Sequence, residues 1–221
     1  MIRWYAIFWL WCCVTSVWAN DTAANSKLIL DKNNIKIWTY KVPQSSLSGF
    51  KATTVVKSTL SGLVALILDT QNADRWLYRT NRIDVLARDN SQKHFTIRVI
   101  TDFPWPFTDR EALVDVHIHQ DSKTGQVRID SNESPYEAKY PVNDCCLRMP
   151  MVKGYWLFKP VSNGMVEVSM SGHADPGGRI PVGAVNFLIQ EHPYNTLMGL
   201  QNIISDEKYQ KAINTQIKEP L

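Results

Sequence analysis

The chain of 221 residues carries little excess charge of either sign. Its 24 Lys and Arg against 21 Asp and Glu give a formal net charge of +3, too small to indicate nucleic-acid binding on electrostatic grounds. Gly and Pro number only 10 and 11, and 44% of the residues are apolar, which excludes collagen-like, low-complexity and disordered chains. A chain of this length is typical of a single domain.

The sequence also lacks the short motifs that mark common catalytic centres. It contains no Gly-x-Ser-x-Gly, no Gly-x-Gly-x-x-Gly, no phosphate-binding loop and no His-Glu-x-x-His. No nucleophile and base stand at a spacing that indicates a catalytic pair. We therefore expect no catalytic residue, no metal and no cofactor.

The longest apolar run lies at the N-terminus. Residues 1–19 carry one charge, Arg3, then an apolar run from Trp4 to Val14, then the small residue Ala19. This order is typical of a secretory signal peptide, and we expect cleavage after Ala19. An uncleaved anchor is less favoured, because the run is shorter than the roughly 20 residues that span a bilayer. The sequence therefore predicts an exported protein, most simply one of the bacterial periplasm.

Removal of this leader would leave Cys145 and Cys146 as the remaining cysteines. Consecutive Cα atoms lie about 3.8 Å apart, which is closer than ordinary disulfide geometry prefers. We favour two free thiols on opposite faces of a strand. A disulfide between the two neighbours, or pairing between chains, stays open.

The remaining chain is predicted to be a flexible N-terminus (20–26), one domain (27–205) and a polar C-terminal tail (206–221). Runs with strand character alternate with turn residues along most of the domain. Helical spacing appears in two short segments and one long final segment, in which Pro193 should introduce a kink. The expected strands are 27–31, 35–42, 50–57, 83–88, 94–103, 111–120, 126–131, 147–160 and 165–174. The expected helices are 60–68, 73–78 and 181–205.

This order of elements predicts an α+β fold with a curved antiparallel sheet. Such a sheet has one apolar face, which needs a cover, and only the last helix is long enough to provide it. A curved sheet that grips one long helix commonly leaves a cavity, and cavities of this kind hold small molecules. The candidate lining residues are apolar or small polar side chains on the inward faces of two strands and the helix: Val114, Val116, Ile118, Val166, Val168, Met170, Val185, Ile189, His192 and Thr196.

Two groups of polar residues suggest alternative roles. Asp115, His117 and His119 share one face of a strand and could bind zinc. We favour a solvent-facing role for them, because no second histidine pair at ligand spacing supports a metal. His173 and His192 lie at the edges of the expected cavity, where a structural role is favoured over catalysis.

Three segments of the chain resemble one known family. Residues 105–111 read Trp-Pro-Phe-Thr-Asp-Arg-Glu, and residues 148–154 read Arg-Met-Pro-Met-Val-Lys-Gly. Residues 173–181 read His-Ala-Asp-Pro-Gly-Gly-Arg-Ile-Pro, and Pro-Tyr-Asn-Thr-Leu follows at 193–197. In this order, over roughly residues 27–205, they resemble START domains, the steroidogenic acute regulatory protein-related lipid-transfer family.

The resemblance implies a helix-grip fold, in which the sheet wraps around the C-terminal helix and encloses a tunnel for one lipid. It implies binding and transfer rather than catalysis, a transient contact with a membrane surface, and a monomer. Ligand access in the family involves the C-terminal helix and the loop that corresponds to residues 132–144. The motif residues are expected to be architectural: Trp105, Arg110, Asp175 and Gly177.

The sequence departs from sterol-binding members at Val116, where many of them carry a buried Arg, so a sterol is not implied. Our main hypothesis is a periplasmic protein that binds a lipid in an internal cavity and carries or presents it. Two alternatives remain. One is a helix-grip enzyme, of the cyclase or hydrolase kind, with His173 or His192 as base. The other is an interaction module with a filled core.

Overall fold

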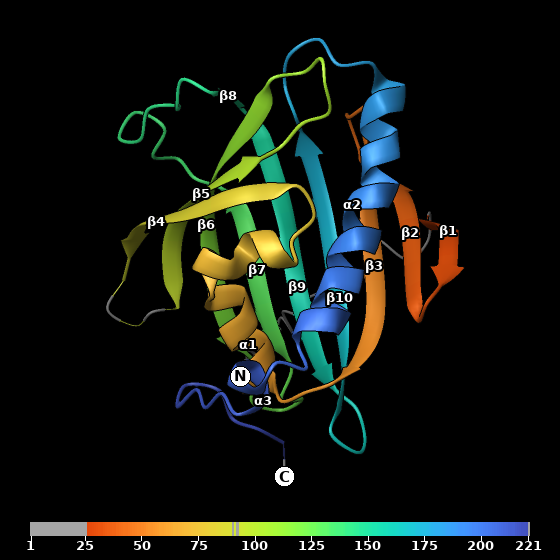
Figure 1. Ribbon diagram of the computed structural model, residues 1–221, viewed down its shortest axis with the longest axis vertical. Coiled ribbons are helices and arrows are strands. Elements are labelled where there is room, and N and C mark those ends of the chain that lie inside the picture. Colours follow the sequence, from red (N-terminus) through yellow and green to blue (C-terminus); the bar gives the residue numbers. More distant parts are fainter. Residues whose placement is uncertain (1–25, 90, 92, 221) are drawn as a thin grey trace, which may run out of the picture.

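The computed structural model describes residues 26–89, 91 and 93–220, which form one large sheet around a long helix (Figure 1). The predicted signal peptide and residues 20–25 of the predicted flexible segment lie outside the described residues. The strands are β1 (Ser26–Lys32), β2 (Ile35–Lys41), β3 (Ser48–Lys57), β4 (Thr80–Arg88), β5 (His94–Thr101), β6 (Asp109–Gln120), β7 (Val127–Glu133), β8 (Cys146–Arg148), β9 (Met151–Pro160) and β10 (Met165–Asp175). The helices are α1 (Leu60–Leu68), the 3-10 helix η1 (Thr70–Arg75), α2 (Val182–Ile203) and α3 (Glu207–Gln210).

The strands follow the order β1-β2-β3-β10-β9-β7-β6-β5-β4, and the short β8 pairs with β6 off this path. All pairs are antiparallel except β6 with β8, which is parallel. The last strand therefore pairs with β3, and α2 follows it directly across the sheet (Figure 1). This arrangement confirms the predicted α+β, helix-grip architecture.

The first hairpin illustrates how local sequence fixes part of this sheet. Asn33 and Asn34 connect β1 to β2 and have φ values of 54° and 59°. Two central residues with positive φ give a turn whose twist matches that of the flanking strands, and Asn tolerates this conformation better than most residues. The predicted strands 27–31 and 35–42 therefore pair as an antiparallel hairpin.

Two predicted elements differ from the structure. The expected strand 147–160 is divided into β8 and β9 around Pro150, which cannot donate to a strand ladder. The expected helix 73–78 is the earlier η1, which follows α1 directly. Within this turn the Asn72 side chain donates to the Asp69 carboxylate at 2.9 Å, and the Asn72 backbone amide donates to the Asp69 carbonyl.

Helix α2 runs without interruption through Pro193. Its C-terminal half contributes Leu197, Leu200 and Ile203 to the hydrophobic core, together with side chains of α1 and the inner face of the sheet. The N-terminal half carries fewer buried residues, among them Val185. The two halves of one helix therefore have different environments, and this difference locates the cavity described below.

The segment predicted as a polar tail packs on the domain. Tyr209 of α3 is 2% exposed and Ile217 is 8% exposed. The carboxylate of Glu219 accepts hydrogen bonds from the backbone amides of Leu60 and Ser61, at 2.9 and 2.7 Å. It thereby satisfies donors in the first turn of α1 that have no partner within the helix.

The two neighbouring cysteines form a disulfide, Cys145–Cys146. The favoured interpretation, two free thiols on opposite faces of a strand, is therefore wrong. Cys145 belongs to a turn and Cys146 begins the short β8, so the pair does not lie within a regular strand that would separate the two side chains.

Arg110 is a buried cation that joins β6 to the turn before α2. Its side chain is 2% exposed and donates to the carbonyl oxygens of Pro176 at 2.6 Å and Gly177 at 3.3 Å. It also donates to the Thr108 carbonyl and lies over the Phe103 ring, 4.6 Å from the ring centre. Arg110 therefore holds the β10–α2 connection and the β5–β6 connection at the same end of the sheet.

The other motif residues divide into two kinds. The Asp175 carboxylate accepts a hydrogen bond from the Gly177 amide at 2.8 Å, and Gly177 has a φ of 65°, which favours glycine. Both residues shape the turn that Arg110 holds. Trp105 is 92% exposed, so its side chain contributes little to the packing of the fold. The architectural role expected for Trp105 is not supported by this placement.

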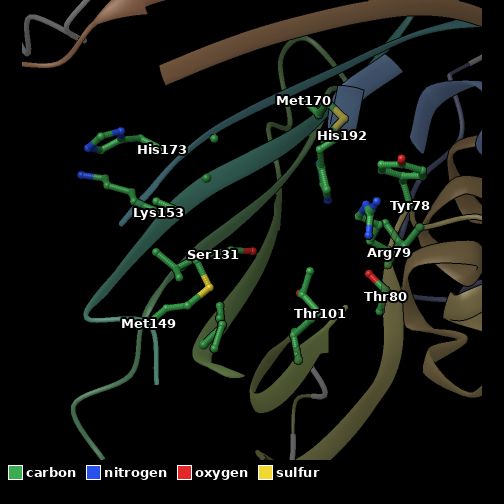
Figure 2. A pocket seen from close by; sticks show the side chains of 18 of the residues that line it. Tyr78, Arg79, Thr80, Thr101, Ser131, Met149, Lys153, Met170, His173 and His192 are labelled. Carbon is green, nitrogen blue, oxygen red and sulfur yellow. The ribbon is translucent and has the colours of Figure 1, made fainter. Parts of the chain in front are cut away.

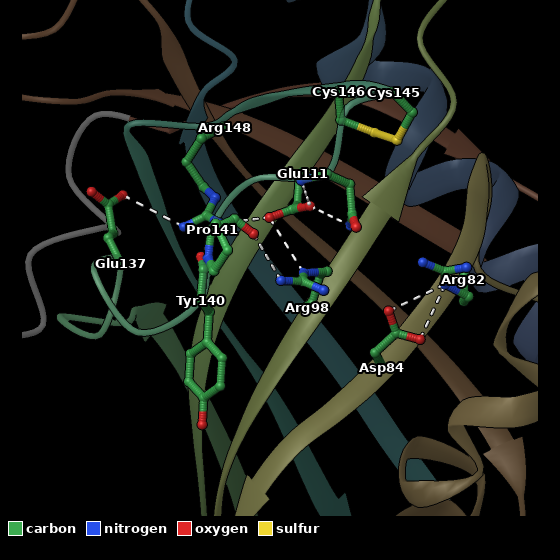
Figure 3. Close-up of polar contacts among 11 residues, drawn as sticks. Arg82, Asp84, Arg98, Glu111, Glu137, Tyr140, Pro141, Cys145, Cys146 and Arg148 are labelled. Atoms are coloured by element: carbon green, nitrogen blue, oxygen red, sulfur yellow. Dashed lines mark hydrogen bonds and ion pairs between the residues drawn. A yellow bond between two sulfur atoms is a disulfide. The ribbon is translucent and has the colours of Figure 1, made fainter.

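Glu111, the next residue of β6, points to the opposite face and anchors a long loop (Figure 3). Its fully buried carboxylate accepts from the Asn143 amide at 3.0 Å and from Arg148 at 2.6 Å, and lies 3.4 Å from Arg98. Burial alone raises the pKa of Glu111, but the hydrogen bonds from Asn143 and Arg148 and the charges of Arg98 and Arg148 outweigh it and lower the pKa. Arg98 and Arg148 also donate to backbone carbonyls of the loop itself.

Replacement of the buried Arg110 tests its hydrogen bonds to the turn between β10 and α2. Arg110→Ala should lower the free energy of unfolding by about 3 kcal/mol, because buried carbonyls lose a charged donor. Urea denaturation measures the loss. The control is Arg82→Ala, since Arg82 is 59% exposed in its pair with Asp84 and should contribute about 0.5 kcal/mol or less. Equal losses in the two variants would contradict the assigned role.

Glu111→Gln should make stability less dependent on acid pH. A carboxyl whose pKa is lowered on folding stabilises the fold above its ordinary pKa of 4.5, and this stabilisation is lost as the pH falls through the folded value. We expect a loss of about 3 kcal/mol at pH 7. The loss should shrink at pH 3, because pH 3 lies below the ordinary pKa of 4.5 and the stabilisation by the wild-type carboxylate declines there. Urea denaturation at both pH values measures the free energy of unfolding of this variant and of the control, Glu137→Gln, at an exposed site. A loss at pH 3 as large as at pH 7 would disprove the explanation.

Candidate ligand-binding cavity

A cavity of about 360 Å³ lies between the inner face of the sheet and the N-terminal half of α2 (Figure 2). Its walls come from the η1–β4 connection, from strands on both sides of the sheet centre, and from α2. Most of the side chains that face it are apolar, including Phe95, Ile97, Val99, Ala112, Ile129 and Trp156. The volume and the apolar lining match sites that bury a small organic ligand. The interior is not filled by side chains, which argues against an interaction module with a filled core.

Six of the ten residues predicted to line a tunnel face this cavity. They are Val114, Val116, Met170, Val185, Ile189 and His192. Those on β6 are brought together by the alternation of side chains along a strand, and those on α2 by helical spacing. The periodicity of the sequence is therefore sufficient to place these side chains on the correct face.

The other four predicted residues lie outside the lining. Ile118, Val166 and Val168 are buried in the core farther along their strands, where they pack in one cluster with side chains of α1. Thr196 is also fully buried, and its hydroxyl accepts a hydrogen bond from the Tyr78 amide at 3.2 Å. Periodicity assigns a residue to a face, but it does not tell at which point along that face the cavity ends.

Several polar residues of the wall were not predicted. Arg79 pairs with Asp102 at 2.7 Å, and the Tyr78 hydroxyl donates to Glu191 of α2 at 3.2 Å. Arg79 has a φ of 58° and directs this group from the connection between η1 and β4. No periodic pattern covers an irregular connection, so only the tertiary structure brings these residues to the cavity. The charges of this wall are paired with one another.

His192 projects from α2 into the cavity, and Ser131 projects toward it from β7 (Figure 2). Burial lowers the pKa of His192 to about 4, so the imidazole is neutral at pH 7. His192 is half-buried and lines the cavity. Neither side chain forms a hydrogen bond with any residue that the structure describes.

His173 has a different orientation. In Figure 2 its ring and the side chain of Lys153 point away from His192 and from the centre of the cavity. The Nδ1 atom of His173 is buried and has no hydrogen-bond partner within the described part of the chain. The described lining residues place no nucleophile within hydrogen-bonding distance of His173 or His192.

The alternative zinc site does not assemble. Asp115 accepts a hydrogen bond from Thr96 at 2.7 Å, and the His117 ring stacks on His94 at 3.9 Å between ring centres. His119 lies near a different carboxylate, Asp130, at 3.9 Å. Among residues 26–89, 91 and 93–220, no group of three or more His, Cys, Asp or Glu side chains could hold a metal.

The loop to which the resemblance assigns ligand access, residues 132–144, contributes no side chain to the cavity lining. It packs instead against the outer face of the sheet, where Glu111 holds it through Asn143 (Figure 3). The β5–β6 and β10–α2 connections, which Arg110 joins, contribute Asp102, Phe103 and Pro176 to the lining.

Comparison with known proteins finds both sequence and structural similarity. No protein-family model matches the chain. An uncharacterised protein of Pseudomonas aeruginosa is 25% identical over 189 residues, which cover 86% of this chain and 91% of that protein.

Solved structures resemble the chain over most of its length. A STAR-related lipid transfer protein from Xanthomonas axonopodis matches with a TM-score of 0.73 and 23% identity, over 81% of this chain and 98% of that one. Human StAR-related lipid transfer protein 5 matches with a TM-score of 0.72 and 12% identity, over 83% and 88% of the two chains. At such identities the likeness establishes the fold, and the protein has the START fold that its three motif segments predict.

Proposed function

We propose that the protein binds a lipid, or another apolar small molecule, in its internal cavity and carries or presents it outside the cytoplasm. The observation that carries this proposal is the cavity of about 360 Å³ with a mostly apolar lining between the sheet and α2. An apolar ligand gains about 25 cal/mol for each Å² of apolar surface that leaves water, so few polar contacts are needed for binding. The START fold of the chain supports the same function.

The predicted export is supported by the cysteine pair. Residues 1–19 have the pattern of a secretory signal peptide, and Cys145 and Cys146 form a disulfide. Disulfides persist in oxidising compartments such as the periplasm and are rare in the cytosol. We therefore propose that the ligand is carried between, or presented at, membranes that face the periplasm. No helix within the described ranges is both long and apolar enough to cross a membrane.

Exposed apolar residues at one end of the domain offer a surface for membrane contact. Trp105 is 92% exposed on the β5–β6 connection, and Val182 and Phe187 of α2 are 44% and 62% exposed. Arg110 holds the two connections together by its contacts with Phe103 and Pro176. Both connections also reach the cavity lining, so a membrane bound at this end would lie next to the ligand.

A cavity-filling variant tests ligand binding. Val114→Trp places an indole where the ligand would lie and should reduce uptake of a pyrene-labelled fatty alcohol from liposomes at least tenfold. The control is Val161→Trp, at a site that is 47% exposed, which should leave uptake unchanged. Native mass spectrometry of the wild type purified from its host should detect a co-purifying lipid. If no lipid co-purifies with the wild type and the wild type takes up none from liposomes, the proposed function is disproved.

A surface variant tests the membrane contact separately. Trp105→Ser should weaken binding to vesicles of phosphatidylethanolamine and phosphatidylglycerol by about tenfold, since burial of an indole in the interface is worth one to two kcal/mol. Vesicle flotation measures binding, and thermal unfolding should be unchanged. Ile213→Ser is the matched control, because Ile213 is 90% exposed on the segment after α3. Equal weakening by both substitutions would contradict a specific contact through Trp105.

A further inference from the structure

Two uncharged polar side chains without protein partners face the apolar cavity from opposite elements. His192 belongs to α2 and Ser131 to β7, and both face the cavity (Figure 2). Both residues are half-buried, and a ligand that fills the cavity would take their polar atoms out of water. A polar group buried without a hydrogen bond costs free energy, so such groups generally have a partner. Within the described part of the chain neither residue has one. A ligand that fills the cavity is therefore expected to supply these hydrogen bonds.

Ser131 ends a row of four residues that pair across the sheet, and His192 of α2 lies beside Phe50 at the other end of that row. Phe50 of β3 pairs with Gly172 of β10, Gly172 pairs with Gly154 of β9, and Gly154 pairs with Ser131 of β7. The His192 ring lies beside Phe50, with 6.4 Å between the ring centres. Two strand spacings, about 10 Å, separate Gly172 from Ser131.

The middle of this row carries no side chain. A Cβ atom at Gly154 would lie 2.6 Å from the Ser171 carbonyl oxygen, and one at Gly172 would lie 2.8 Å from the Phe50 ring. Both glycines are therefore required by close packing, and they leave the cavity floor bare between His192 and Ser131. A ligand can lie against this floor with one polar group near the two side chains.

The hydrogen-bond donors and acceptors of His192 and Ser131 determine which polar group of a ligand can bind there. The neutral imidazole of His192 offers one donor and one acceptor, and the Ser131 hydroxyl offers both functions as well. A hydroxyl or a carbonyl oxygen complements them. The charge of Arg79 is met by Asp102 at 2.7 Å, and Lys153 is exposed and points away.

A charged headgroup would fit this interior poorly. Transfer of an ion from water into an apolar cavity costs several kcal/mol of free energy unless the ion pairs with an opposite charge there. His192 at pH 7 carries no charge that could meet an anion, because burial keeps its pKa at about 4.

We propose that the cavity selects a neutral amphiphile with a single hydroxyl or carbonyl group, which is bound between His192 and Ser131. This inference rests on the proposed function, because it presupposes that a ligand enters the cavity. The hydrocarbon part of the ligand lies against the apolar side chains of β5 and β6. Phospholipid and fatty-acid headgroups are excluded from the interior by their charge.

The test compares 1-decanol with decane, two ligands that differ by one hydroxyl group. Displacement of Nile red from the purified protein gives the dissociation constant of each ligand, and the ratio of the two constants is compared among variants. This comparison cancels the different solubilities of the two ligands. His192→Leu should shift the ratio about tenfold against decanol, and Ser131→Ala about threefold, as expected for lost neutral hydrogen bonds. His192→Gln, which retains a donor and an acceptor, should restore part of the preference.

The matched control is Thr101→Val. Thr101 also lines the cavity, but it lies opposite Thr80 on β4, away from the row that contains Ser131. The proposal predicts an unchanged ratio for this variant. A shift in Thr101→Val together with no shift in His192→Leu and Ser131→Ala would overturn the proposal and place the polar group at the β4–β5 wall.

Two further results separate this inference from the proposed function. If decanol and decane displace the probe but no variant changes their ratio, the selectivity is wrong and ligand binding stands. If neither ligand displaces the probe and no lipid co-purifies, the proposed function itself fails. Decanoate at pH 7 should bind more weakly than decanol. Tighter binding of decanoate that is lost in His192→Leu would show that the ligand is an anion and would also overturn the proposal.

Discussion

The structure depends on two successive buried charges at the start of β6. Arg110 and Glu111 are neighbours on a strand, so their side chains leave opposite faces of the sheet. Arg110 holds the turn at Pro176 and Gly177 that leads into α2. Glu111 holds the loop on the outer face through Asn143, together with Arg98 and Arg148. Removal of either charge would leave buried partners without a hydrogen bond, so both residues are important for the stability of the fold.

The position of the cavity follows from these anchors and from the two halves of α2. Leu197, Leu200 and Ile203 of the C-terminal half pack tightly with α1 and the sheet. The N-terminal half is held by the Arg110 turn and packs less closely, so space remains beneath Val185 and His192. A cavity in this place lies next to the exposed end of the domain, where a ligand could enter without unfolding of the core.

The electrostatics of the interior favour a neutral ligand. At the cavity wall Arg79 is paired with Asp102, and the imidazole of His192 is kept neutral by burial. His192 and Ser131, which face the cavity without a hydrogen bond to the described part of the chain, are uncharged at pH 7. An apolar cavity of this kind obtains its affinity from the transfer of hydrocarbon out of water and its selectivity from a few hydrogen bonds.

The sequence by itself determined the order of the elements, the hairpin at Asn33 and Asn34, and the face on which Val114, Val116 and Met170 lie, because periodicity and turn chemistry are local properties. Its motif segments also predicted the START fold. The tertiary structure alone decided where the cavity ends, so that Ile118 and Val168 lie in the core beyond it. It also brought Arg79 and Ser131 to the cavity wall. It also showed that the segment around Ile217 packs on the domain and that Cys145 and Cys146 are joined. These features depend on contacts between residues far apart in the chain, or on the local backbone of a turn, and no periodic pattern encodes either.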